Sequence, residues 1–446
     1  MAAASDKIVR IGCASGFWGD TTFGARQLVD HGAIDYLVFD YLAEITMSLL
    51  ARARDKDPNA GFVPDFVHGV VKPLAKDIAA KKIKVIANAG GVNPIACKAA
   101  LEAVLAEAGV ALKVAAVIGD DLLPEIDRIR KAAPVEMFSG AAMPAAVLSA
   151  NAYLGATPIR AALADGADIV VTGRAVDSAV ALGALMHAFG WADDDYDRLA
   201  AGSAAGHVIE CGAQATGGLF TDWRLVADGW DDMGFPVVEC VDDGTFVVTK
   251  PPGTGGLVSC ATIAEQLVYE VGDPAAYLLP DVTCDFSRIS LEQVGDDRVA
   301  VSGVRGRAPG THYKVSATWH DGYRVAGTLM IGGFEAAAKA QAVGDALVRR
   351  TRRLFRDRNL GDYDEVSLEV LGSEATYGPH STAKASREVI LKLAARHQEK
   401  AALELLAREI APSATAMSPG ITGMAGGRPR AQPVIRLFSL DRKSVV

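Results

Sequence analysis

The chain has 446 residues, of which 50% are hydrophobic, so it can bury a large core and is not a small scaffold that depends on disulfides. Its formal net charge of −9 gives no electrostatic reason to expect nucleic acid or an anionic membrane as a partner. The six cysteines form no CxxC pair, and no apolar stretch reaches the roughly 18 residues of a membrane span. We therefore expect a reduced, cytoplasmic protein, and its apolar content leads us to expect a homo-oligomer.

The amino-terminal half alternates apolar, strand-like runs with amphipathic segments. The strand-like runs begin at Ile8, Ile34, Ile83, Leu112 and Ala167. Helical periodicity predicts helices over residues 23–32, 72–82 and 94–109. Uninterrupted apolar strands are typical of a sheet that is buried on both faces, and the alternation favours parallel strands. We predict an α/β fold in which a parallel sheet is flanked by helices.

The pattern changes near Val237, where period-two segments begin. Two hairpins are predicted, one around residues 295–297 and one through Asp321 and Gly322. Amphipathic segments predict helices over residues 334–358 and 381–410, with a strand at 365–372 between them and an irregular loop over 415–433. We therefore predict two subdomains, an α/β subdomain over residues 1–236 and an α+β subdomain with an antiparallel sheet over 237–446.

Polar loops follow the predicted strands of the first subdomain. The carboxyl ends of parallel strands share one edge of a sheet, where ligands and catalytic groups gather. Asp40 and Glu44 follow the second strand and can divide proton-transfer roles or bind a divalent ion; a helix cap with a first-turn Glu is the structural alternative. Arg174 and Asp177 follow the last strand, where Arg174 can hold a carboxylate or phosphate, or the pair can simply lock the loop.

The segment GHVIECGAQATGG contributes two further catalytic candidates, Glu210 and Cys211. Glu210 is a candidate acid or base. Cys211 is a candidate nucleophile, which requires a cationic neighbour such as His207 to form a thiolate. Structural roles are the alternative for both residues.

Glycine-rich loops supply the candidate substrate-binding residues, because glycine lets backbone amides approach an anion. These loops match neither GxGxxG nor GxxxxGK[ST], so a dinucleotide site and nucleotide hydrolysis are disfavoured. No HExxH or HxH spacing indicates zinc, so we predict no metal and no cofactor. Tight turns with helix caps are the structural alternative. The candidate substrate-binding residues are Ser15, Asn88, Gly90, Gly91, Asn93, Asp120, Lys250, Gly253, Thr254, Gly255 and Gly256.

Six segments in the same order resemble the acyclic terpene utilisation (AtuA-type) family. They are SGFWGD at 15–20, DYLAEITMSLLAR at 40–52, ANAGGVNP at 87–94, VTGRAVDSA at 171–179, GHVIECGAQATGG at 206–218 and KPPGTGGLVS at 250–259. The resemblance implies a part in the breakdown of acyclic terpenoids through acyl-CoA intermediates. Some members carry a further small carboxyl-terminal domain that this chain stops before, so a separate small subunit is an expected partner. The resemblance assigns no role to individual residues.

The leading hypothesis is an enzyme that performs a lyase or hydratase step on a small-molecule carboxylate or a branched acyl-CoA thioester. Arg174 and the glycine loops would hold anionic groups, and Asp40, Glu44 or Glu210 would move a proton next to the carbonyl. Two alternatives remain open at this point. One is a non-catalytic ligand-binding or assembly subunit of a catabolic acyl-CoA complex, and the other is a metal-assisted hydrolase that uses Asp40, Glu44 and Asp120.

Overall fold

A computed structural model describes residues 7–383, 385–423 and 426–443. The chain forms two compact units. Unit 1 comprises Met1–Thr318 and Leu437–Val446, and unit 2 comprises Trp319–Arg436. The predicted subdomain boundary at residue 236 does not coincide with this division, because the strands that follow it continue the sheet of unit 1. None of the helices in the described ranges combines the length and the apolar character that a bilayer crossing needs.

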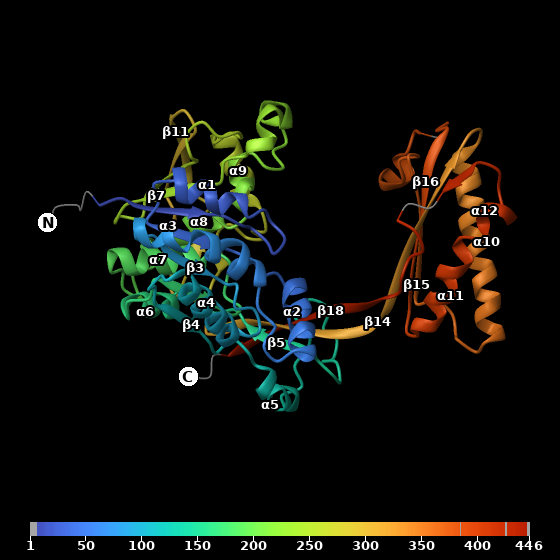
Figure 1. The fold of residues 1–446 in the computed structure, drawn as a ribbon, viewed down its shortest axis with the longest axis horizontal. Helices are drawn as coiled ribbons and strands as arrows, with labels where there is room; N and C mark the ends of the chain where they lie inside the picture. The colour runs from blue at the N-terminus through green and yellow to red at the C-terminus, as the bar shows by residue number, and fades with distance from the viewer. Residues whose placement is uncertain (1–6, 384, 424–425, 444–446) are drawn as a thin grey trace. The chain divides into compact units, whose positions relative to one another are not determined.

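Unit 1 is built on a nine-stranded sheet with the order β11-β12-β8-β7-β1-β2-β3-β6-β4 (Figure 1). Five consecutive strands are parallel to one another: β1 (Val9–Cys13), β2 (Tyr36–Phe39), β3 (Lys84–Ala87), β6 (Ile169–Thr172) and β4 (Val114–Val117). Four strands extend the sheet in antiparallel pairing: β7 (Val237–Cys240), β8 (Phe246–Thr249), β12 (Arg298–Ser302) and β11 (Ser290–Gly295). The predicted α/β class is confirmed, and the predicted hairpin around residues 295–297 forms as β11 and β12.

Helices cover both faces of the parallel strands, as the apolar strand sequences predict. Successive residues of one strand enter different cores: Leu37 packs in one apolar cluster and Val38 in the other. The cluster around Leu37 contains α1 (Phe23–His31), α3 (Lys72–Lys81) and α4 (Pro94–Ala108). The cluster around Val38 contains α6 (Thr157–Ala164), α7 (Ala179–Phe189), α8 (Tyr196–Ile209) and α9 (Cys260–Val268).

The predicted helices begin and end where their sequence signals lie. In α4, the Asn93 side chain accepts a hydrogen bond from the amide of Ala96 at 3.3 Å, Pro94 begins the helix, and Gly109 ends it at φ +68°. Further elements of unit 1 are α2 (Glu44–Lys56), a π-helical turn (Phe66–Val71), α5 (Ile126–Lys131), β5 (Ser149–Ala152), and a small sheet of β13 (Arg305–Arg307), β10 (Thr283–Asp285) and β9 (Tyr277–Leu278).

The long strand β14 (His312–Gly332) replaces the hairpin predicted through Asp321 and Gly322. The strand continues without a turn because its two halves pair with different strands. Residues 315–318 pair with β5 in unit 1, whereas residues 323–332 pair with β16 (Glu388–His397) in unit 2. The prediction of a hairpin here is wrong, since each half of β14 pairs with a strand that is distant in sequence and the two halves do not pair with each other.

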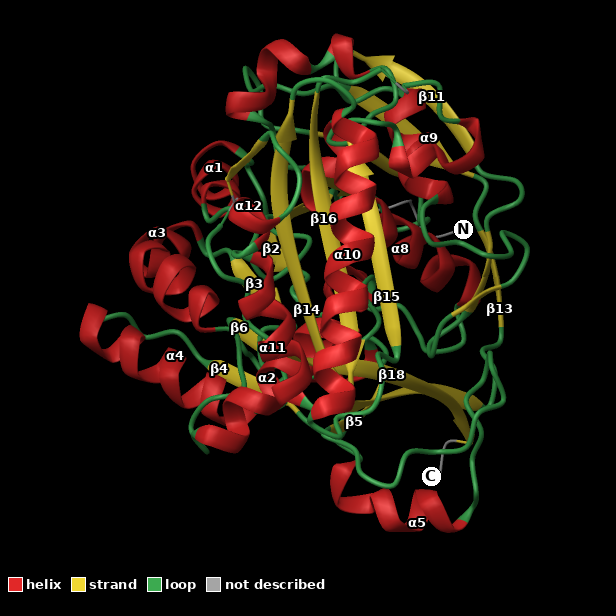
Figure 2. Ribbon diagram, turned by 90° about the vertical axis from the view of Figure 1, so that its right-hand side faces the viewer, coloured by secondary structure: helices red, strands yellow, loops and turns green. Residues whose placement is uncertain are grey.

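Unit 2 contains an antiparallel sheet with helices on one face, as predicted for the second subdomain (Figure 2). Its elements are the end of β14, α10 (Ala336–Asp357), β15 (Glu365–Leu371), β16, α11 (Lys400–Ile410), α12 (Ser413–Ala416), β17 (Ile421–Gly423) and the start of β18 (Gln432–Lys443). The single helix predicted over 381–410 is wrong, because Val389, Leu391 and Leu393 alternate as in a strand, and helical periodicity begins only at Lys400. Residue 384 of that segment and residues 424–425 of the predicted loop lie outside the described residues.

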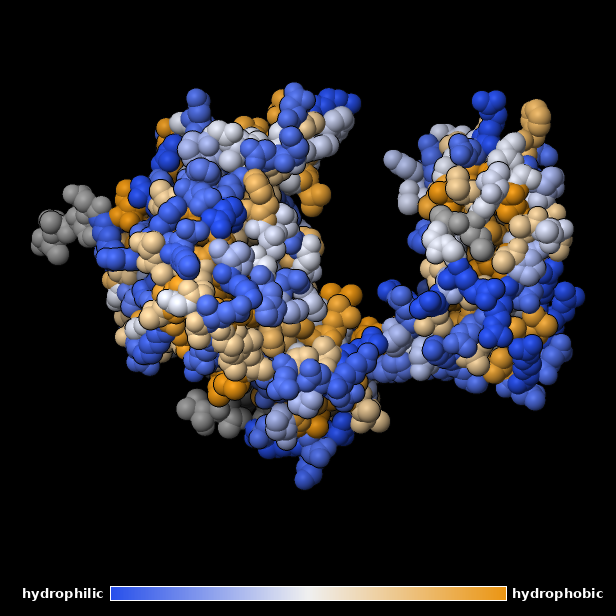
Figure 3. Space-filling model, viewed as in Figure 1, coloured by the Kyte–Doolittle hydropathy of each residue, from blue (hydrophilic) through white to orange (hydrophobic). Residues whose placement is uncertain are grey.

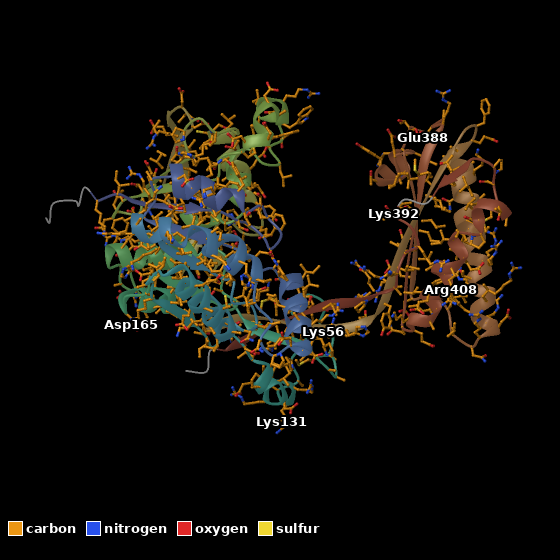
Figure 4. The ribbon with its side chains drawn as sticks, in the orientation of Figure 1. Lys56, Lys131, Asp165, Glu388, Lys392 and Arg408 are labelled. Atoms are coloured by element: carbon orange, nitrogen blue, oxygen red, sulfur yellow. The ribbon has the colours of Figure 1, made fainter. Side chains whose placement is uncertain are left out.

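The alternation along β16 explains how its two faces differ. Val389, Leu391 and Leu393 are buried against α10 and α11. Lys392, labelled in Figure 4, points to the other face, where its Nζ lies 3.1 Å from Glu369 Oε1 of β15. Figure 3 shows hydrophilic and apolar side chains side by side on the visible face of unit 2, and the apolar cluster between its sheet and α10 and α11 forms the core of this unit.

Candidate functional site

The carboxyl ends of the parallel strands bring Ser15, Asp40 and Asn88 together. The amide of Asp40 donates to the carbonyl oxygen of Ser15 at 3.0 Å, and the Asn88 side chain donates to Asp40 Oδ1. Asn88 Oδ1 accepts from the amide of Tyr41 at 2.7 Å, which fixes the loop after β2. Burial raises the pKa of Asp40 well above its usual value, and the charge of Asp177 acts in the same direction, while Arg174 opposes them. Asp40 therefore lies close to Arg174 and Asp177, the two polar residues in the loop that follows β6.

Arg174 follows β6 at this edge of the sheet and is 4% exposed. Its Nη1 donates to Asp177 Oδ1 at 2.6 Å and to the carbonyl oxygen of Ala175 at 2.8 Å. The guanidinium carbon lies 4.2 Å from the centroid of the Tyr153 ring, which is a cation–π contact. Burial acts to lower the pKa of Arg174, but the charges of Asp177 and Asp40 outweigh it, so the guanidinium stays protonated.

Asp120 fixes the backbone of the loop that contains Arg174. Its Oδ2 accepts from the amide of Arg174 at 2.8 Å and from the Asn151 side chain at 2.8 Å. Burial raises the pKa of Asp120 to about 6, although both hydrogen bonds act in the opposite direction. Asp120 contacts Gly173 so closely that a Cβ there would lie 2.2 Å from Asp120 Oδ1. The residue therefore positions Arg174.

Glu44, Tyr153 and Lys314 form a second polar group on the same side of the molecule. Tyr153 donates its hydroxyl to Glu44 Oε1, and Lys314 Nζ lies 3.3 Å from the same oxygen. Lys314 Nζ also lies 4.7 Å from the centroid of the Tyr153 ring. Burial alone would raise the pKa of Glu44, but the hydrogen bond from Tyr153 and the charges of Arg174 and Lys314 lower it to about 2. Glu44 is therefore a carboxylate at neutral pH.

Glu210 and His207 form a buried pair at the end of α8. His207 Nδ1 lies 2.8 Å from Glu210 Oε1, whereas Glu210 Oε2 and His207 Nε2 have no hydrogen-bond partner. Burial raises the pKa of Glu210 to about 7, although His207 acts in the opposite direction. Burial also raises the pKa of the neighbouring Cys211 thiol to about 12, so Cys211 is not a thiolate at neutral pH.

A cavity of about 640 Å³ lies in unit 1 beside these groups. Its wall contains Glu44, Arg174 and Asp177 from the predicted site. Asp40, Asp120 and Glu210 are buried behind the wall and do not line it. Most of the exposed surface of the wall is apolar, and acidic, cationic and tyrosyl side chains lie between the apolar ones. The remaining lining residues are Leu42, Ala43, Met137, Tyr153, Val176, Glu270, Tyr277, Leu278, Leu279, Pro280, Gly310, His312, Tyr313, Lys314 and Asp441.

The glycine loop after β3 does not contribute to the cavity wall. Asn93 caps α4 and donates its side-chain amide to the carbonyl oxygens of Pro58 at 2.9 Å and Ala60 at 2.8 Å. Gly90 leaves no room for a Cβ, which would lie 2.5 Å from the carbonyl oxygen of Thr172, and Gly91 has φ +56°. The close contacts of this loop are therefore with neighbouring backbone segments of unit 1.

The polar groups of the loop at Lys250 likewise have partners within the fold. Lys250 Nζ lies 2.9 Å from Asp297 Oδ2 and donates to the carbonyl oxygen of Thr254 at 2.7 Å. The amide of Gly255 donates to the carbonyl oxygen of Asp232 at 2.7 Å. Ser15 similarly uses its hydroxyl within its own loop, to the carbonyl oxygen of Phe17 at 2.9 Å. Lys250, Gly253, Thr254, Gly255, Gly256 and Ser15 are not among the lining residues of the cavity.

Sequence reasoning missed several polar wall residues, among them Tyr153, Lys314 and Glu270. Tyr153 directly follows β5, a strand of small residues with no apolar alternation. Lys314 lies in the segment read as the first half of a hairpin. Glu270 has φ +61°, a conformation that bulky residues rarely adopt, and no sequence signal marks it.

The family model described as "Acyclic terpene utilisation family protein AtuA" matches residues 9–444. Comparison with curated proteins and with solved structures gives no match. The match spans both units and every polar residue of the cavity wall.

Proposed function

Because the chain belongs to the acyclic terpene utilisation family AtuA, we propose that it is an enzyme of terpenoid or branched-chain acid catabolism. Its substrate is a branched apolar carboxylate or the acyl-CoA thioester of one, and the reaction is a lyase or hydratase step. The observation that carries this proposal is the cavity wall of unit 1. There, apolar side chains lie beside the ionised carboxylate of Glu44, the phenol of Tyr153 and the cations Arg174 and Lys314, and three further carboxylates line the same wall.

The composition of the wall matches the two chemical parts of such a substrate. Leu42, Val176 and Leu279 offer apolar contacts to a branched hydrocarbon chain. Arg174 and Lys314 offer positive charge to a carboxylate or to the phosphates of a thioester carrier. A volume of about 640 Å³ lies within the range of small-molecule sites, roughly 300–1,000 Å³.

Proton transfer next to a carbonyl needs a proton acceptor and a group that stabilises the negative oxygen of the enolate. Glu44 is the acceptor, because it is ionised and lines the cavity. The Tyr153 hydroxyl and the Lys314 ammonium are the stabilising donors, because both lie against Glu44 at the same wall. An anionic substrate competes for these two donors. When they turn to the substrate, Glu44 loses the contacts that lower its pKa and becomes a stronger base.

The buried polar residues support the wall. Asp120 fixes the backbone of Arg174, and Asp40 and Asp177 surround its guanidinium. These contacts hold Arg174 in one orientation, which is the requirement for a site that binds an anion in a defined geometry.

Turnover of the purified full-length chain with a panel of branched acyl-CoA thioesters and free acids tests the proposal. We expect turnover of at least one member, and a fall in kcat of roughly 10²-fold or more for Tyr153→Phe and for Glu44→Gln. Tyr196→Phe is the matched control, since Tyr196 does not line the cavity, and it should leave kcat unchanged. Binding of a panel member without turnover would instead indicate a ligand-binding subunit. If no member of the panel is bound or turned over, both the enzyme and the ligand-binding subunit are refuted.

A further inference from the structure

Three carboxylates from separate parts of unit 1 converge beside the cavity. Asp177 follows β6, Glu210 follows α8, and Glu270 follows α9. One carboxylate oxygen of each lies within 4.8 Å of an oxygen of the others. Asp177 and Glu270 line the cavity, and Glu210 is buried directly behind them, with 3% of its surface exposed. Like charges at this spacing repel one another unless a proton or a cation lies between them.

Glu210 supplies an independent sign that a ligand is missing from this cluster. His207 Nδ1 holds Glu210 Oε1 at 2.8 Å, but Glu210 Oε2 is buried and has no hydrogen-bond partner. Buried polar atoms are nearly always satisfied in folded proteins, and leaving one without a hydrogen-bond partner is costly. The contact with His207 also orients the carboxylate, as the outer partners of metal ligands commonly do.

The positive charge already present does not balance the cluster. Arg174 Nη1 pairs with Asp177 Oδ1 at 2.6 Å, and the same guanidinium also faces the buried Asp40. That leaves Glu210 and Glu270 without a lysine or arginine among the ion pairs of the described residues. A divalent cation would supply the missing charge.

We propose that Asp177, Glu210 and Glu270 bind one divalent cation of the oxygen-preferring class, Mg²⁺ or Mn²⁺. A set of carboxylate oxygens without a thiolate or a directly coordinating imidazole suits these hard ions and not zinc. Water molecules or oxygens of the bound ligand complete the coordination, because two of the three carboxylates face the cavity. The proposed site differs from the set Asp40, Glu44 and Asp120. Those three carboxylates already have side-chain partners: Asp40 contacts Asn88, Glu44 contacts Tyr153 and Lys314, and Asp120 contacts Asn151.

Binding of the cation does not depend on the proposed reaction. A part for the cation in that reaction, such as polarising the carbonyl oxygen of the substrate, rests on the proposed function. The two are therefore tested separately, the first by metal binding without substrate and the second by turnover.

The decisive measurement is Mn²⁺ binding to the full-length chain, followed by electron paramagnetic resonance after the protein has been treated with a chelator and desalted. We expect one Mn²⁺ per chain, displaced by excess Mg²⁺, and an affinity weakened roughly 10-fold or more by Glu210→Gln and by Glu270→Gln. The matched control is Glu265→Gln on α9, whose carboxylate accepts from the amide of Thr221 at 3.3 Å outside the cluster. This control should bind as the unmodified chain does.

The exposed position of Glu270 keeps the test valid if the buried Glu210 variant does not fold. Absence of saturable Mn²⁺ binding by the unmodified chain would overturn the inference. Equal affinity in the Glu270→Gln variant, the control and the unmodified chain would overturn it as well. Neither result would bear on the turnover assay, so failure of the cation site and failure of the proposed enzyme are distinguishable.

Discussion

The charge of Glu44 is expected to stabilise unit 1 in a way that depends on pH. The pKa of Glu44 falls from an ordinary value of 4.5 to about 2 in the folded chain. A lowered pKa means that the stabilisation is fully present above pH 4.5 and is lost as the pH falls through about 2. Each pH unit of that interval corresponds to about 1.4 kcal/mol, which sets a ceiling of about 3 kcal/mol. The side chain is 31% exposed, so screening by water reduces the expected value to about 1–2 kcal/mol.

The substitution Glu44→Gln tests this reasoning, because glutamine keeps an oxygen that accepts from Tyr153 and removes the charge opposite Lys314. We expect the variant to be less stable than the unmodified chain by about 1–2 kcal/mol at pH 7, and we expect this difference to shrink below pH 4.5. Urea unfolding followed by tryptophan fluorescence suits the measurement, since four of the five tryptophans, Trp18, Trp191, Trp223 and Trp230, lie in unit 1.

The control for this experiment is Glu107→Gln. Glu107 pairs with Lys72 at 2.9 Å on the surface, where its side chain is 64% exposed, so its loss should cost less than about 0.5 kcal/mol. A difference between Glu44→Gln and the unmodified chain that is equally large at pH 7 and pH 3 would refute the electrostatic account. So would a cost at pH 7 no greater than that of the control.

Three further predictions concern the groups around Arg174. Arg174→Met should lower the free energy of unfolding by about 3–5 kcal/mol in urea titrations, because it leaves Asp177 and Asp40 without their cation; a loss below about 1 kcal/mol would contradict the central place of Arg174. Gly173→Ala should cost about 1–3 kcal/mol, since its Cβ would lie 2.2 Å from Asp120 Oδ1. Gly272→Ala, where a Cβ meets nothing within 4 Å, should be neutral in the same assay. Cys211→Ser should leave turnover intact, because burial raises the pKa of the thiol to about 12; abolished turnover would restore Cys211 as a candidate nucleophile.

The part of the site that could be predicted from the sequence is the part that parallel strands create. Asp40, Asn88 and Arg174 each follow an uninterrupted apolar run, and the shared edge of a parallel sheet brings such residues together whatever their separation in the chain. The strand runs themselves were readable because both faces are buried, so nearly every residue of each run is apolar.

The part that could not be predicted depends on pairing between distant segments. Tyr153 reaches the cavity because β5 pairs with residues 315–318 of β14, and that register has no local signal. Lys314 lies on the same strand, whose continuation past Gly322 is determined by β16 and not by the turn-like sequence. The loop at Lys250 has the composition of an anion-binding turn, yet Asp297 neutralises the ammonium, and only the three-dimensional structure shows this partner.

Unit 1 is interrupted in sequence by unit 2, and this order has a consequence for biosynthesis. The amide of Met137 donates to the carbonyl oxygen of Ser439 at 2.9 Å, and Asp441 belongs to the wall of the cavity. On the ribosome, these last contributors leave the exit tunnel only after Trp319–Arg436 has been translated. Unit 1, whose translation begins first, therefore completes its fold last. A nascent chain arrested within Trp319–Arg436 still lacks the last residue of the cavity wall, Asp441.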